Sequence, residues 1–212
     1  MLTRTIGLVV YSTTFDELQN LILSGKLTKS QLVELARKLQ IVDQDFPAWS
    51  SALSAETLGF SVAMVRASEG GRLDWFDFAK QWGWRFTVSP GSAILKTLEE
   101  KEAYLHRVEK LDQMSFAEVR KEIDAISAEM AASPDASVRI SASDLLRSIV
   151  TYRKVLADLR VLRAAATFLG TGEMIQLPDP FGENLLYTDE GNKVKVESVG
   201  SGDGQIAMVL TR

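Results

Sequence analysis

The sequence predicts a mostly helical protein, a helical bundle with a small C-terminal unit of three antiparallel strands packed on the last long helix. Apolar residues recur at helical spacing over much of the first 170 residues, and glycines and prolines separate these segments. After Pro178 the pattern changes to short stretches that alternate with turn residues. We expect a helical region over residues 1–140, and the long helix with its β tail over residues 141–212, packed together as one domain.

The composition narrows the classes of function. Of the 212 residues, 46% are hydrophobic and 25% are charged, which suffices for a packed core. The net charge of -4 comes from interspersed acids and bases, so we expect no nucleic-acid partner. Cysteine is absent and His106 is the sole histidine, which excludes thiolate chemistry and His-rich metal sites. The apolar stretch 6–11 is far too short to span a membrane, so we expect no membrane insertion.

The N-terminal segment predicts two helices. Apolar residues from Leu2 to Ile22 recur at steps of three to five, and Gly25 ends this helix. Thr28 is placed to cap the second helix, which carries three leucines on one face: Leu32, Leu35 and Leu39.

The middle of the chain predicts three further helices. Proline favours the first helical turn, so a helix is expected over residues 47–66. Another is expected over residues 93–112. A third, over residues 115–132, begins with Ser115 and Glu118 at the spacing of a capping box, in which each side chain accepts a free backbone N–H.

The last helix has the strongest pattern. Its apolar residues alternate steps of four and three: Leu145, Ile149, Tyr152, Leu156 and Leu159. Basic residues occupy other positions: Arg147, Arg153, Lys154 and Arg160. Ser143 or Ser141 is placed to cap this helix, and Gly170 or Gly172 to end it.

The tail predicts strands over residues 185–187, 193–199 and 206–210. Residues 189–192 supply turn residues that tolerate positive φ, and a glycine-rich loop follows at 200–204. Three strands with one apolar face need a packing partner, and the long helix is the one available.

The C-terminal segment LPDPFGENLLYTDEGNKVKVESVGSGDG carries a family pattern. In that pattern an Asp-Pro-aromatic-Gly element precedes a strand containing tyrosine, and a Ser-aromatic-Gly-x-Asp-Gly loop follows the next strand. The matching residues are Asp179, Pro180, Phe181, Gly182, Tyr187, Ser198, Gly200, Asp203 and Gly204. The segment resembles the C-terminal part of bacterial type II secretion pseudopilins, and little-characterised bacterial envelope proteins that place a helical region before the same ending.

The resemblance covers about the last quarter of the chain, and it departs from pseudopilins in two respects. Their hydrophobic N-terminal helix has no counterpart here, and Gly202 is an extra residue in the loop. It implies a location on the periplasmic side of a bacterial envelope, through an anchor outside this chain, with protein partners such as secretion or pilus machinery. A cytoplasmic location stays open. Physically, Tyr187 is expected to pack its ring on the helix and keep its hydroxyl in water.

Calcium is the one cofactor that the resemblance implies. In pseudopilins the corresponding loop holds this ion, which requires about six to eight oxygen ligands. Here Asp203 and Asp179 are the candidate ligands, with Asp189 as a further carboxylate. The alternative is a Gly-Asp turn between strands without metal.

An aromatic segment, residues 72–86, is the candidate partner-binding surface. Its large rings are Trp75, Phe76, Phe78, Trp82, Trp84 and Phe86. Such rings dominate contact energies when they are exposed. The alternative is that they form the core of the helical region.

The remaining candidates concern catalysis. His106 lies within reach of Glu102 and Glu109 on a charged helix, which is typical of a surface histidine. A carboxylate-dependent, hydrolase-like enzyme would draw its acid and base from Glu56, Asp74 and Asp77. No serine lies in a nucleophile-elbow setting.

The sequence therefore favours a non-catalytic interaction or scaffolding domain of a bacterial envelope protein. The alternative is the carboxylate-dependent enzyme.

Overall fold

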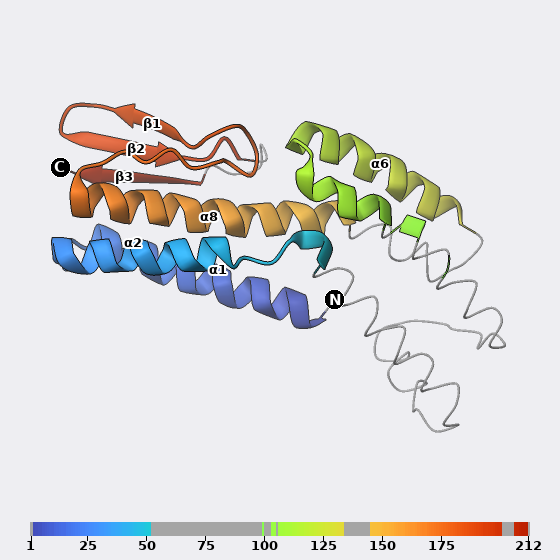
Figure 1. Cartoon of the computed structure of the whole chain (residues 1–212), viewed down its shortest axis with the longest axis horizontal. Coiled ribbons are helices and arrows are strands. Elements are labelled where there is room, and N and C mark those ends of the chain that lie inside the picture. Colours follow the sequence, from blue (N-terminus) through green and yellow to red (C-terminus); the bar gives the residue numbers. More distant parts are fainter. Residues whose placement is uncertain are drawn as a thin grey trace, which may run out of the picture. The chain divides into compact units, whose positions relative to one another are not determined.

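The computed structural model describes residues 2–51, 99, 103–104, 106–133, 145–200 and 206–211. Within them the chain is mostly helical and ends in a three-stranded antiparallel sheet that packs on the last helix, as the sequence predicts (Figure 1).

The chain divides into two compact units. Unit 1 comprises Met1–Pro47, Met114–Lys121 and Asp144–Arg212, and unit 2 comprises Ala48–Gln113 and Glu122–Ser143. The expected boundary near residue 140 lies among residues that the structure does not describe, so it stays a prediction.

Unit 1 begins with two helices, α1 (Leu2–Leu23) and α2 (Lys29–Gln44). Gly25 takes a φ of 67° in the turn between them, a conformation that glycine adopts at little cost. The predicted cap is confirmed: the backbone N–H of Gln31 donates to Oγ1 of Thr28 at 3.2 Å, and the N–H of Thr28 donates to Oε1 of Gln31 at 2.9 Å. The glutamine completes a capping box.

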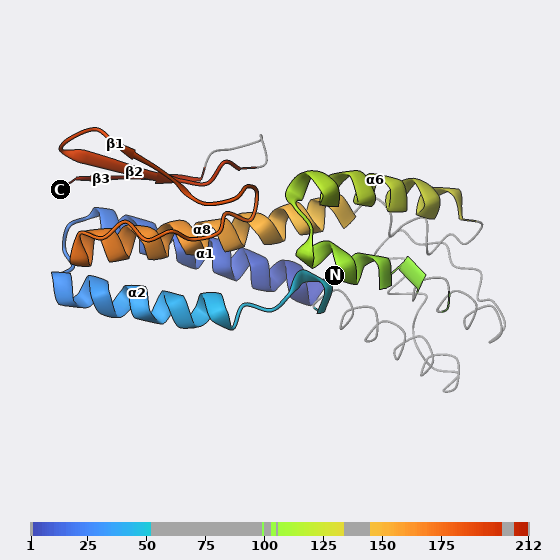
Figure 2. The same ribbon diagram turned by 45° about the horizontal axis from the view of Figure 1, so that its top comes forward.

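The long helix α8 (Leu145–Thr171) is the centre of unit 1. Helices α1 and α2 pack against it on one side, and the sheet covers another side (Figure 2). Because neighbours cover several faces, residues all round the helix are buried, including Val155, Leu159, Val161, Leu162, Ala164, Ala165 and Ala166. The apolar stripe in the sequence is therefore only part of the buried surface.

The sheet has the order β1-β2-β3, formed by β1 (Leu186–Asp189), β2 (Lys193–Glu197) and β3 (Ala207–Thr211). The bounds differ from the expected ones by at most two residues. Tyr187, Val196 and Met208 stand opposite one another, and so do Asp189, Val194 and Leu210. The valines, Met208 and Leu210 are buried, which places this face of the sheet in the core.

The hydroxyl of Tyr187 has a protein partner that the sequence did not indicate. The ring packs against the core as predicted, but the hydroxyl donates a 2.7 Å hydrogen bond to the backbone oxygen of Ile175. Burial raises the pKa of Tyr187 to about 12, since the charged phenolate is poorly solvated there. The segment between α8 and β1 supplies the partner that water was expected to supply.

Two further helical elements lie where the sequence predicts helices. Residues 103–104 and 106–109 are helical and lead into the 3-10 helix η1 (Lys110–Gln113). Helix α6 (Phe116–Ala132) begins with the predicted capping box, because Glu118 accepts the N–H of Ser115 at 3.0 Å and donates its own N–H to Oγ of Ser115 at 3.4 Å. Among the described residues no helix is both long and apolar enough to cross a membrane.

Candidate functional site

Most of the predicted site residues lie outside the part of the chain that the structure describes. These are the calcium candidate Asp203, the aromatic set and the acidic set: Trp75, Phe76, Phe78, Trp82, Trp84, Phe86, Glu56, Asp74 and Asp77. Their assignments stay predictions. Asp179, Asp189 and His106 are described. Asp189 ends β1, and its Oδ1 accepts the N–H of Gly191 at 2.9 Å.

Asp179 lies in the turn between α8 and β1, and its residue is only 4% exposed. Its Oδ1 accepts hydrogen bonds from the N–H of Phe181 at 2.9 Å and from Oγ of Ser198 at 2.7 Å. Its Oδ2 accepts the N–H of Val199 at 2.7 Å. Three donors from this chain therefore satisfy a buried carboxylate, and they join the turn to the end of β2.

The arrangement gives Asp179 a structural role that needs no metal ion. Among the described residues no group of three or more acids or histidines could hold a metal ion. The proposed second ligand, Asp203, belongs to residues 201–205, which the structure does not describe. The calcium assignment therefore stays a prediction.

Two arginines of α8 bind backbone oxygens of the same turn. Arg153 donates to the backbone oxygen of Pro180 at 2.6 Å, and Arg160 donates to that of Pro178 at 2.9 Å. Arg153 also donates to the oxygen of Met114 at 3.1 Å and lies 5.5 Å from the ring centroid of Phe116, a cation–π contact. In the sequence, both arginines lie outside the apolar stripe of the helix. That position does not indicate which groups they bind.

His106 lies on the surface. Its Nδ1 is 3.3 Å from Oε2 of Glu109, one of the two acids expected within reach, and the histidine side chain is 68% exposed. An exposed ion pair of this kind contributes little to stability and forms no catalytic arrangement by itself.

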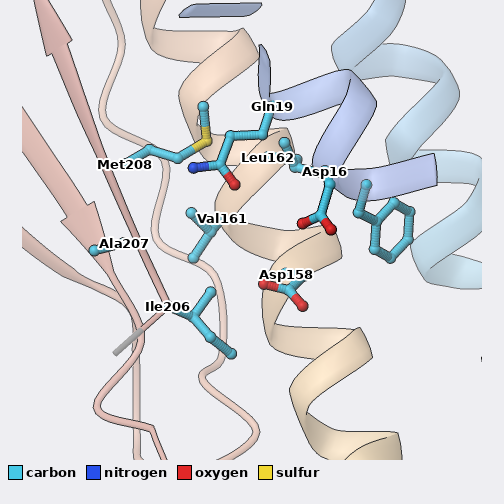
Figure 3. A pocket seen from close by; sticks show the side chains of 9 residues that line it. Asp16, Gln19, Asp158, Val161, Leu162, Ile206, Ala207 and Met208 are labelled. Atoms are coloured by element: carbon cyan, nitrogen blue, oxygen red, sulfur yellow. The ribbon is translucent and has the colours of Figure 1, made fainter. Parts of the chain in front are cut away.

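The described part of unit 1 contains a pocket that the sequence analysis missed. It has a volume of about 150 Å³ and lies between α1, α8 and β3 (Figure 3). Its lining is Phe15, Asp16, Gln19, Asp158, Val161, Leu162, Ile206, Ala207 and Met208. Two carboxyl groups and an amide therefore face a wall that is otherwise largely apolar.

Asp158 has the unusual electrostatics in this pocket. Burial raises its pKa to about 6, the neighbouring charge of Asp16 acts in the same direction, and Lys154 opposes them. Figure 3 shows the two carboxyl groups directed toward the same space from α1 and α8. A carboxyl with this pKa exchanges its proton close to neutral pH.

The sequence alone did not identify Asp158, because its burial depends on elements that are distant in the sequence. In the sequence it is one polar residue between Leu156 and Leu159 on an amphipathic helix, which normally means a solvated position. Only the packing of α1 and β3 on α8 places it in a partly buried pocket.

The comparisons with known proteins add no relative. No protein-family model, no curated protein and no solved structure matches the chain.

Proposed function

We propose that the chain is a non-catalytic interaction or scaffolding domain of a bacterial envelope protein, with protein partners in secretion or pilus machinery. The observation that supports a non-catalytic role is that charged side chains inside unit 1 bind backbone groups of the same unit. The buried side chains of Asp179 and Arg153 and the partly buried side chain of Arg160 all bind backbone groups in or near the turn between α8 and β1. Side chains used in this way add to stability rather than to chemistry.

The envelope setting rests on the resemblance of the C-terminal segment. The structure gives several of the matching residues a common physical role: Asp179 meets Ser198 and Val199, and the backbone of Pro180 meets Arg153. These contacts tie the turn before β1 to α8 and to the end of β2. A segment held in this way suits assembly with other proteins, because little ordering cost is left for binding.

A cross-linked pull-down of the full-length protein from its native cells, read by mass spectrometry, tests this proposal. We expect secretion or pilus proteins among the recovered partners. Replacement of Trp75 and Trp82 by alanine, with circular dichroism to confirm retained helix, should reduce their recovery. The exposed substitution Glu183→Gln serves as the matched control and should leave recovery unchanged. Recovery of soluble background alone would contradict the proposal.

A carboxylate-dependent enzyme is the second candidate, and the pocket with Asp16 and Asp158 favours it. A general acid needs a pKa near the working pH, which Asp158 has. The volume argues against it, because about 150 Å³ is well below the roughly 300 Å³ at which ligand pockets usually begin. Assays of hydrolase substrates with the wild type and with Asp158→Asn distinguish the two proposals. A hydrolase activity that the wild type has and the variant lacks would favour the enzyme over the scaffolding domain.

A further inference from the structure

The two interfaces that α8 makes with its neighbouring helices differ in charge. Where α2 meets α8, the carboxylate of Asp43 lies between two arginines, Arg160 and Arg163, each at 2.9 Å. Where α1 meets α8, Asp16 faces Asp158 across the pocket (Figure 3). Opposite charges stabilise the first contact, whereas like charges oppose the second when both carboxyl groups are ionised.

The groups around Asp158 come from three elements. From α1 the pocket receives Asp16 and the neutral amide of Gln19. From α8 itself Lys154, one turn earlier, attracts the carboxylate and offsets part of the repulsion. The described residues of β3 and its approach, 206–211, carry no titratable group. In the described part of the chain, the titratable groups at this pocket are therefore Asp16, Asp158 and the nearby Lys154.

We propose that the Asp16–Asp158 pair makes the docking of α1 on α8 depend on pH, so that α1 packs tightly when the pair holds a proton and loosens when both carboxyl groups are ionised. Phe15, next to Asp16, and Ile22 are buried and anchor α1 at neutral pH. The change is therefore a local loosening around the pocket and not a loss of the fold.

The direction follows from linkage. Asp158 has a pKa of about 6 in the folded protein against 3.8 in an unperturbed chain. Between these values the docked state binds a proton that the undocked state releases. Docking is therefore strongest below about pH 4 and weakens as pH rises through 6, and above that it stays constant.

Hydrogen exchange of backbone amides, corrected for the intrinsic pH dependence of exchange, tests the proposal on the intact chain. We expect amides of residues 13–23 in α1 to lose roughly ten-fold in protection between pH 5 and pH 7.5, because about one pH unit of the interval between 3.8 and about 6 lies above pH 5. Amides of α2 should keep their protection, because its contact with α8 pairs opposite charges.

Variants separate the pair from other titrating groups. Asp158→Asn should keep α1 protected at both pH values, and Asp16→Asn should reduce the pH effect by removing the repulsion. The exposed Asp124→Asn is the control and should behave as the wild type. Equal protection of wild-type α1 at both pH values, or a pH effect that survives in Asp158→Asn, would overturn the proposal. Should that variant fail to fold, Asp16→Asn decides: a smaller pH-dependent loss of α1 protection than in the wild type supports the proposal, and an equal loss overturns it.

Discussion

Nε of Arg160 on α8 donates a 2.9 Å hydrogen bond to Oδ1 of Asp43 on α2, 117 residues earlier in the chain. Arg163 donates to the other oxygen of the same carboxylate, also at 2.9 Å. The side chain of Asp43 is 9% exposed and those of the arginines are 19% and 17% exposed. One carboxylate thus links two helices through two short charged contacts, in surroundings that water screens only in part.

Asp43→Asn should destabilise the protein. Removing one partner of a buried pair costs about 3–5 kcal/mol, and we expect about 2 kcal/mol here because both arginines keep some contact with water. Urea unfolding measures the change. Glu34→Gln is the matched control, since the Glu34–Arg37 pair lies on the surface and should contribute nothing measurable. Equal stability of Asp43→Asn and Glu34→Gln would show that the link is unimportant.

Gly170→Ala should destabilise the protein, although alanine normally stabilises a helix interior by about 1 kcal/mol relative to glycine. A Cβ at Gly170 would lie 3.0 Å from Cγ2 of Val33 and 3.2 Å from its backbone nitrogen. Overpacking of this kind costs about 1–3 kcal/mol, so a net loss is expected in thermal or urea unfolding.

A second substitution checks the cause of this loss. Val33→Ala in the Gly170→Ala background removes the side-chain clash but not the backbone one, so it should recover part of the lost stability. A gain in stability for Gly170→Ala alone would mean that α2 and α8 are less closely packed than described.

Tyr187 should titrate later than an ordinary tyrosine. Its pKa is raised to about 12, so between pH 10 and 12 the unfolded chain loses a proton that the folded chain keeps. Stability should therefore fall as pH rises through this window, and Tyr187→Phe should abolish that part of the fall. The chain has four tyrosines, and absorbance at 295 nm should show one of them ionising near pH 12. Coincident curves for wild type and variant above pH 11 would refute the assignment.

Local features of the fold were predictable from the sequence. The capping residues Thr28 and Ser115 act within three residues of their partners, so spacing alone identifies them. The turn at Gly191 is equally local, because the N–H of Gly191 donates to Oδ1 of Asp189, two residues earlier.

Long-range features were not predictable in the same way. The Asp43–Arg160 contact joins helices whose mutual orientation no spacing rule gives. The environment of Asp158 arises only when α1 and β3 both pack on α8. The resemblance pointed to Asp179, but two of its three donors, Ser198 and Val199, come from another part of the tail, 19 and 20 residues later.

Buried charged side chains of unit 1 hold the fold together, and substitutions at Asp179 are the sharpest check of this role. Unfolding free energies are to be measured for Asp179→Asn, Ser198→Ala, the double variant and the exposed control Glu183→Gln. Hydrogen bonds to a charged group contribute about 1.5–3 kcal/mol, so we expect Asp179→Asn to lose at least about 2 kcal/mol and Ser198→Ala about 1 kcal/mol.

In the double variant Ser198→Ala should add little to the loss, because the two residues share the 2.7 Å contact, and Glu183→Gln should match the wild type. Stability of Asp179→Asn equal to that of the wild type would contradict the claim. It would show that this carboxylate is kept for a purpose other than the fold, with calcium the first ligand to test.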